Sequence, residues 1–170
     1  MKQMEVTEKK IGESTFYIKP FPAFVSANIS GELAALITPM LSGLAPLVGG
    51  ISDDGANFDI GNVNVEDAMP AISNAFAGLS GDKFEKLMKK LLIDHKNVSV
   101  ACEATNGETK VMDYDLANEV FCMEIEDMYI LCFEVIRLNF GGFFKKLGAR
   151  FGNLQALVQR VAPSTANTAN

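Results

Sequence analysis

The chain has 170 residues and a formal net charge of −6, from 15 Lys and Arg against 21 Asp and Glu. This length fits one domain with a sizeable core, and the acidity argues against nucleic acid as a partner, because phosphate binding needs clustered Lys and Arg. No basic start followed by an apolar stretch indicates a signal peptide, so we expect a cytoplasmic protein. The three cysteines lack C-x-x-C spacing and are expected to stay reduced: Cys102, Cys122 and Cys132.

The charges fall into blocks along the chain. Residues 20–82 contain seven acids and no base, residues 113–134 contain seven more acids and no base, and residues 135–170 contain five bases and no acid. An acidic body with a basic C-terminal segment favours pairing within the chain or head-to-tail contact between copies. The simpler interpretation, independent solvated faces, stays open.

The N-terminal part predicts a hairpin followed by a helix. Residues 3–18 alternate polar and apolar side chains around Gly12, which is typical of two strands joined by a tight turn. Two prolines end the second strand, and a helix is expected over residues 23–37, because Pro39 breaks its continuation.

The run from Leu33 to Ser52 carries no charge of either sign. About 20 apolar residues can span a bilayer. Pro39 and Pro46 interrupt this run, however, and no Lys or Arg cluster beside it would set an orientation. We therefore expect a buried, broken helix rather than a membrane segment.

After a solvated loop over residues 49–64 and a short helix over residues 65–77, the sequence predicts its clearest helix. The pair Ser80 and Gly81 is expected to break the chain and cap this helix. Apolar residues then recur at helical spacing, at Phe84, Leu87, Met88, Leu91 and Leu92. We expect a surface helix that covers a core with this face.

A second hairpin is expected over residues 98–112, because Asn106 and Gly107 form the preferred pair for a two-residue type I′ turn. That turn sets a register with two facing pairs: Glu103 with Lys110, and Cys102 with Val111. Asp115 is then expected to cap a helix. A largely apolar helix over residues 124–138 is expected at the centre of the core.

The C-terminal stretch, residues 140–161, has apolar residues spaced alternately by four and three, which is a heptad seam. The seam consists of Phe140, Phe144, Leu147, Phe151, Leu154, Val158 and Val161. Four glycines interrupt it, each costing about 1 kcal/mol in a free helix, so we expect the rest of the fold, another copy or another protein to hold it. The candidate partner-binding residues are Phe140, Phe143, Phe144, Leu147, Phe151, Leu154 and Val158.

The sequence carries no set of residues that specifies an active site. The only histidine, His95, follows Asp94 at a helix end, which favours a surface pair over catalysis. No glycine-rich phosphate motif and no G-x-S-x-G motif is present, and the acidic loop 49–64 lacks the ligand spacing of an EF-hand. We therefore expect no enzyme activity, no cofactor and no metal.

Together these elements predict an α+β fold, a mostly helical single domain with two β-hairpins and about five helices over residues 1–162. The tail, residues 163–170, has nothing to bury and is expected to be disordered.

Four segments carry a resemblance to a known family: residues 16–21 (FYIKPF), 28–33 (NISGEL), 79–83 (LSGDK) and, most clearly, 135–146 (VIRLNFGGFFKK). With these the chain resembles the small tail assembly chaperones of tailed bacteriophages of low-GC bacteria. The resemblance implies a non-enzymatic role in the host cytoplasm, where such chaperones keep the tape measure protein soluble until tail tube subunits polymerise around it. It also implies absence from the mature virion, and many members have a second, frameshifted product. Self-association is expected from the charge blocks and the heptad seam.

Two other functions fit the C-terminal stretch. A basic, Phe-rich amphipathic segment can lie in a bilayer interface, although its few bases and the acidic body argue against anionic lipid, and no membrane partner is expected. A structural tail subunit would instead polymerise by itself into rings or tubes.

Overall fold

The computed structural model describes residues 5–44, 70, 73 and 80–161, with side chains described to Leu33 in the first helix and to Phe143 in the last. The elements follow in this order: β1 (Thr7–Ile11), β2 (Ser14–Ile18), α1 (Ala23–Leu44), α3 (Gly81–Leu92), β3 (Val98–Ala101), the 3₁₀ turn η2 (Glu103–Thr105), β4 (Lys110–Val111), α4 (Tyr114–Val120) and α5 (Ile125–Val161).

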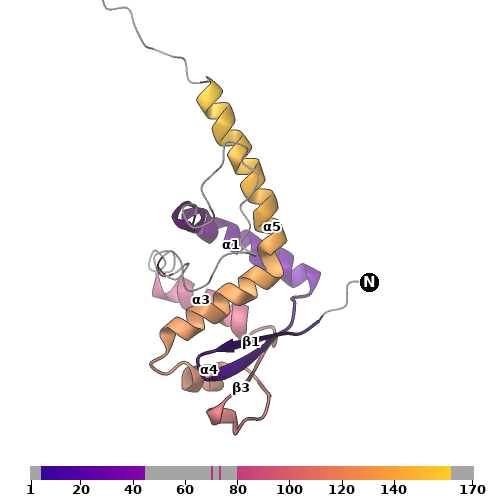
Figure 1. Ribbon diagram of the computed structural model, residues 1–170, viewed down its shortest axis with the longest axis vertical. Helices are drawn as coiled ribbons and strands as arrows, with labels where there is room; N and C mark the ends of the chain where they lie inside the picture. Colours follow the sequence, from indigo (N-terminus) through magenta and orange to yellow (C-terminus); the bar gives the residue numbers. More distant parts are fainter. Residues whose placement is uncertain (1–4, 45–69, 71–72, 74–79, 162–170) are drawn as a thin grey trace, which may run out of the picture.

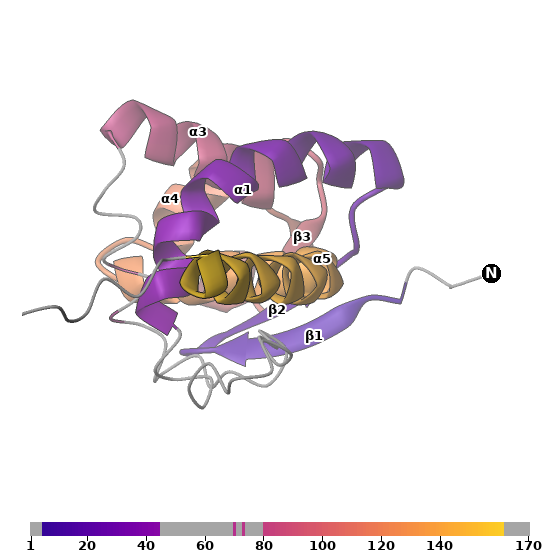
Figure 2. The same cartoon turned by 90° about the horizontal axis from the view of Figure 1, so that it is seen from above.

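Helices and sheet form three layers, with α5 in the middle. The four strands make an antiparallel sheet in the order β1-β2-β3-β4. Seen from above, α5 lies between this sheet on one side and helices α1 and α3 on the other (Figure 2), and it contacts α1, α3 and β1. The predicted α+β class is confirmed.

The first hairpin forms where the alternation predicts it. Ile11 pairs with Ser14 across a two-residue turn, and Gly12 has a left-handed backbone with φ +54°. A Cβ at Gly12 would overlap with the carboxylate of Asp127, at the start of α5. Glycine is favoured here by its left-handed backbone, and a larger residue would in addition require the flexible carboxylate of Asp127 to move.

Helix α1 continues through Pro39 to Leu44, so the predicted end at Ile37 is wrong. A proline in a helix interior removes one hydrogen bond and bends the helix, and α1 is visibly bent (Figure 2). Its first turns bury Ile29 and Leu33 against the core. The predicted loop 49–64, the helix over 65–77 (apart from residues 70 and 73) and the tail 163–170 lie outside the described residues.

Helix α3 confirms the clearest helical pattern in the sequence. Leu87, Met88, Leu91 and Leu92 are buried, and on the other face Lys89 pairs with Glu85 at 2.6 Å. Ser80 occupies the N-cap position without a side-chain cap hydrogen bond.

The predicted register of the second hairpin is wrong. The strands β3 and β4 pair Ser99 with Val111 and Val100 with Lys110, so Cys102 does not face Val111 and Glu103 lies in the 3₁₀ turn. The cause is local: the Thr105 hydroxyl accepts from the N–H and donates to the C=O of Cys102, both at 3.0 Å. Such side-chain bonds to the backbone compete with a strand ladder.

Asn106 and Gly107 nevertheless adopt the left-handed backbone that the pair was expected to supply, with φ 53° and 76°. The connection between β3 and β4, however, is longer than the predicted two-residue turn. The local conformation was thus predicted correctly and its place in the ladder was not.

The cap of α4 also differs from the prediction. Asp113, not Asp115, is the N-cap residue, and its carboxylate accepts from the Leu116 N–H at 2.9 Å. The helix therefore begins at Tyr114, and Asp115 lies in its first turn, where a negative charge is favoured by the helix dipole.

The N-terminal half of α5 is the centre of the core, as its apolar sequence predicts. Its buried apolar residues include Leu131, Cys132, Phe133, Val135 and Ile136. The thiol of Cys132 lies 2.9 Å from the sulfur of Met88, and burial raises its pKa well above the ordinary value. The three cysteines are free thiols.

Candidate functional site: the root of the C-terminal arm

The predicted partner-binding segment, residues 140–161, is the C-terminal part of α5, and we call it the arm. The structure makes it continuous with the core helix, as one α-helix from Ile125 to Val161. In Figure 1, α5 crosses the body, changes direction part-way along and then extends from it. The core helix and the predicted partner-binding segment are thus parts of one bent helix.

Asn139 fixes the point where the arm leaves the body. Its Oδ1 accepts a hydrogen bond from the main-chain N–H of Phe21 at 2.6 Å. Its Nδ2 donates to the C=O of Val135, one turn earlier in α5, at 2.8 Å. The amide thus satisfies a backbone donor beside α1 and keeps its own second polar group bonded, as a half-buried amide requires.

Phe21 is the aromatic centre of this root. It is buried, its ring meets the His95 ring edge-on at a centroid distance of 5.6 Å, and it lies 6.2 Å from the ring of Phe140. These contacts join the segment before α1, the turn after α3 and the first residue of the arm. Edge-on aromatic pairs of this kind contribute about 0.5–1.5 kcal/mol beyond area burial.

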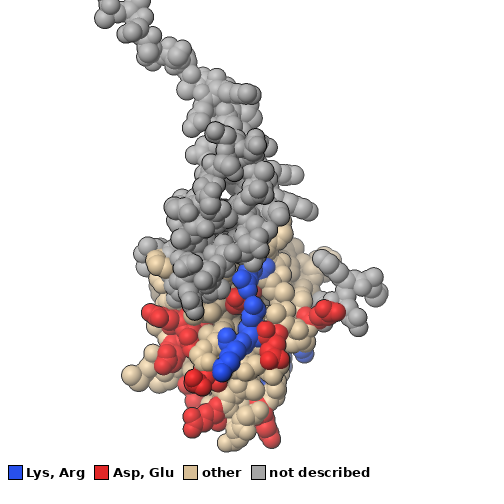
Figure 3. Space-filling model, in the orientation of Figure 1, with Lys and Arg blue, Asp and Glu red and all other residues tan. Residues whose placement is uncertain are grey.

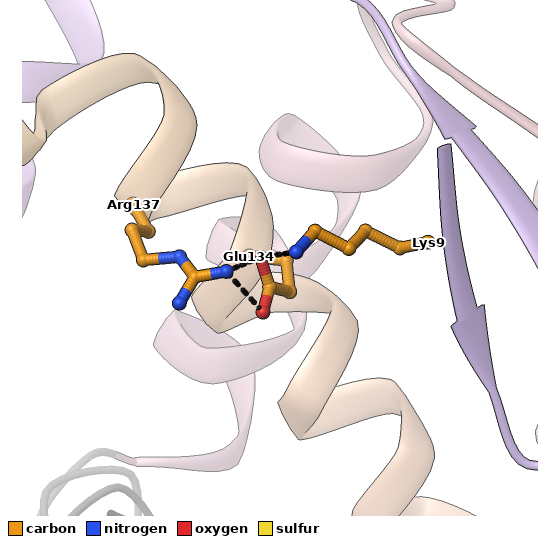
Figure 4. Close-up of polar contacts among 3 residues, drawn as sticks. All are labelled: Lys9, Glu134 and Arg137. Atoms are coloured by element: carbon orange, nitrogen blue, oxygen red, sulfur yellow. Dashed lines mark hydrogen bonds and ion pairs between the residues drawn. The ribbon is translucent and has the colours of Figure 1, made fainter. Parts of the chain in front are cut away.

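A charged cluster ties the sheet to α5 just below the root (Figure 4). The Glu134 carboxylate, with its side chain 8 % exposed, accepts from one nitrogen of Arg137 at 2.7 and 2.5 Å. Lys9 of β1 approaches the same carboxylate at 3.5 Å. One buried anion is therefore held by two cations, one from its own helix and one from the sheet.

Basic side chains on this face form a line that runs from the arm end across the body, with acidic side chains on both sides (Figure 3). Lys9 and Arg137 are engaged with Glu134. This mixed surface gives no field of one sign, unlike the clustered cations of a phosphate-binding face.

The structure places the predicted partner-binding residues in two groups. Phe140 is buried at 2 % exposure in the root, and Phe143 is 40 % exposed. The backbones of Phe144, Leu147, Phe151, Leu154 and Val158 lie on the helical arm, but their side chains are outside the described part of the chain. Their role as contacts stays a prediction.

Sequence patterns pointed to the arm but missed the residues that hold it. Asn139 and Phe21 pair across 118 positions of sequence, and Lys9 reaches Glu134 from the first strand. Two features of the sequence indicated that these positions are special: the prolines on either side of Phe21, and the lone acid in the apolar stretch of α5. Neither feature shows which residue the position contacts in the fold.

The described residues contain no group of three or more His, Cys, Asp or Glu placed to hold a metal ion. His95 meets the Phe21 ring with its edge. None of the described helices is long and apolar enough to cross a bilayer. The contacts of the root described above hold the base of the arm against the segment before α1.

A comparison with protein families gives a match to the model described as phage tail assembly chaperone protein, TAC, over residues 12–152. The chain belongs to this phage tail assembly chaperone family. The match includes the first hairpin turn, the core helices, the root and the larger part of the arm. No curated protein and no solved structure matches the chaperone.

Membership bears directly on the site. The matched region continues beyond the root through Gly152, so the arm of this chaperone is part of the family's shared sequence as far as that residue. A chaperone of tail assembly acts on other proteins, and the arm and its root are accordingly the part of the described structure that we consider for such contacts.

Proposed function

We propose that this chaperone binds the tape measure protein of its phage and keeps it soluble during tail morphogenesis. It does so in the host cytoplasm, by binding and without a catalytic step, and it is not retained in the mature virion. The observation that carries the proposal is the family match from residue 12 to residue 152, which spans the body and most of the arm. Contact with the tail tube protein and self-association belong to the same proposal.

The arm is the proposed contact segment. Its apolar seam repeats at heptad spacing on a helix whose backbone continues to Val161, and an amphipathic helix of this kind is a common way to bind another helix. Phe140 packs in the root in this structure, so we assign the contact with the client to the seam residues beyond it. The seam residues are Phe144, Leu147, Phe151, Leu154 and Val158.

The root makes such a contact more effective. A helix that is fixed at one end loses less conformational freedom on binding than a free segment would. Because the entropic cost of binding is smaller, the affinity for the partner is higher. Asn139 and Phe21 supply that fixation through the 2.6 Å hydrogen bond. The arm is thus presented to a partner as a preformed helix.

The proposal is tested by co-purification of the tape measure protein with tagged chaperone. Full-length chain is compared with a chain ending at Phe143, which keeps the root, and with Leu154→Gln in the seam. Ala156→Gln is the control, because position 156 lies on nearly the opposite side of the helix from Leu154. We expect the full chain and the control to retain the client, and the truncation and Leu154→Gln to lose most of it.

Retention of the client by the chain ending at Phe143, at the level of the full chain, would exclude the arm as the client contact. Failure of the full chain itself to retain the tape measure protein would contradict the proposed function as a whole. Co-sedimentation with liposomes, or rings and tubes formed by the chain alone, would favour the membrane or the structural alternative.

A further inference from the structure

Helix α5 changes direction where it leaves the body (Figure 1). Its backbone is nevertheless one helix from Ile125 to Val161, and this helix contains no proline. Sharp bends in helices occur mostly at proline, at pairs of glycine or serine, or where a residue or water is inserted into the hydrogen-bond ladder. The one pair of adjacent glycines in the sequence of α5 is Gly141 and Gly142, directly after Phe140.

This pair begins where the packing of α5 into the body ends. Phe140 is 2 % exposed and is the last buried residue among the described side chains of α5, which reach to Phe143. Its ring lies 6.2 Å from that of Phe21, and the neighbouring Asn139 accepts from the Phe21 N–H. Residues before the pair are thus held by the root, and Gly142 itself is exposed.

The surroundings do not require glycine at either position. Outside the neighbouring helix backbone, no described atom lies within 4 Å of a Cβ added at Gly141 or at Gly142, so an alanine side chain fits at both. Both residues also lie in a right-handed helix, whereas the described glycines with a left-handed backbone are Gly12 and Gly107. Neither close packing nor a special backbone conformation therefore accounts for the pair.

Flexibility of the backbone does account for it. Glycine has no side chain to restrict φ and ψ, and apart from proline it favours a helix least. Two glycines in succession weaken one turn of α5, between a segment that is packed in the body and a segment that extends from it (Figure 1). Small residues at the boundary of two such segments are typical of hinges.

We propose that Gly141 and Gly142 form a pivot, at which the arm beyond them changes its direction relative to the body while Asn139 and Phe140 stay in the root. The root fixes the place where the arm begins, and the pivot sets the range of directions in which it extends. This inference goes beyond the proposed function, because it concerns a movement of the chain that takes place with or without a client.

The test is the distribution of distances between a spin label on the body and a spin label on the arm, measured by electron paramagnetic resonance on the full chain. Lys86→Cys on the exposed surface of α3 and Gln155→Cys on the arm carry the labels. Cys102 and Cys122 are replaced by Ser, and the buried Cys132 is retained because it is shielded from the label. Labelled chain is diluted with unlabelled chain, so that only distances within one molecule are measured.

We expect a broad distribution in the chain with both glycines, and a single narrow peak when Gly141→Ala and Gly142→Ala are combined. Gly31→Ala in α1 is the matched control, because a Cβ at Gly31 also meets no described atom within 4 Å. It makes the same change of helix propensity at an exposed helix position away from α5. This control should leave the distribution broad, and circular dichroism checks that each variant is folded.

A second control locates the movement along α5. The combination of Gly148→Ala and Gly152→Ala also replaces two glycines of the arm, but at positions beyond the root. It should leave the distribution broad, because the pivot before these residues is unchanged.

Three results would overturn the inference. They are a narrow distribution in the chain with all its glycines, an equally broad distribution after the change at positions 141 and 142, and narrowing by the change at positions 148 and 152 alone. The client is absent from these measurements. A pivot that behaves as described in a chain that does not retain the tape measure protein would leave this inference in place and contradict only the proposed function.

Discussion

The side chain of Asn139 accepts a hydrogen bond from the main-chain N–H of Phe21 at 2.6 Å, across 118 positions of sequence. This bond joins the long helix α5 to the segment that leads into α1, at the place where the arm leaves the body. Because the Phe21 ring is also buried between His95 and Phe140, the bond and the ring together fix the base of the arm.

Replacing Asn139 by Ala should lower the free energy of unfolding by about 1–3 kcal/mol, because the Phe21 N–H is left without its acceptor in a part-buried place. Asn139→Asp keeps an acceptor and should recover part of the loss. Chemical denaturation measures both, with Asn118→Ala on the exposed surface of α4 as the control. Equal stabilities of Asn139→Ala and the control would show that the bond does not hold the root.

Glu134→Ala should destabilise the chain by about 3 kcal/mol, because it leaves the two surrounding cations without their buried anion. Lys9→Ala should cost less than about 1 kcal/mol, since its side chain is 34 % exposed and 3.5 Å from the carboxylate. Denaturant titration of both variants measures which of them loses more free energy of unfolding. A larger loss for Lys9→Ala would contradict the assignment of Glu134 as the centre of the cluster.

Gly12→Ala should cost more than Gly107→Ala, although both glycines have a positive φ. At Gly107 no described atom lies within 4 Å of an added Cβ, whereas at Gly12 the Cβ overlaps with Asp127. We expect about 1 kcal/mol for Gly107→Ala from its backbone conformation, and slightly more for Gly12→Ala, because the flexible carboxylate of Asp127 must also move aside. Combining Gly12→Ala with Asp127→Ala should remove the difference. Thermal melts of the single variants Gly12→Ala, Gly107→Ala and Asp127→Ala and of the double variant would show whether it does.

The thiols should differ in reactivity. Cys122 is exposed and Cys132 is buried, so a thiol reagent should label Cys122 in the folded chain and Cys132 only after unfolding. Burial raises the pKa of Cys132 above its ordinary value of 9.0, so the unfolded state loses this proton first and stability should fall as pH rises above that value. Cys132→Ala should reduce this alkaline decline, and an unchanged decline would assign it to other groups.

Elements set by local patterns were predictable from the sequence. The spacing of Leu87, Met88, Leu91 and Leu92 defined α3, and the alternation around Gly12 defined the first hairpin. The predicted register of the second hairpin was wrong because the Thr105 side chain forms hydrogen bonds with the backbone of Cys102. That is a choice between two local structures of similar energy, which the pattern of apolar residues does not decide.

Contacts between distant parts of the chain were not predictable in the same way. The apolar stretch of α5 showed that a lone acid would be buried, but several lysines could have paired with Glu134, and the sheet brings Lys9 there. The bond from Phe21 to Asn139 depends on the path of the chain before α1. The helical backbone of residues 140–161, in contrast, was indicated by their heptad spacing, and the role of these residues as contacts stays a prediction.

The central claim is that this chain keeps the tape measure protein soluble. The most direct measurement is the soluble fraction of that protein when it is produced alone, with the full chain, and with the chain ending at Phe143. We expect the full chain to hold the client in the soluble fraction and the shortened chain to fail. An equal soluble fraction with and without the full chain would contradict the claim.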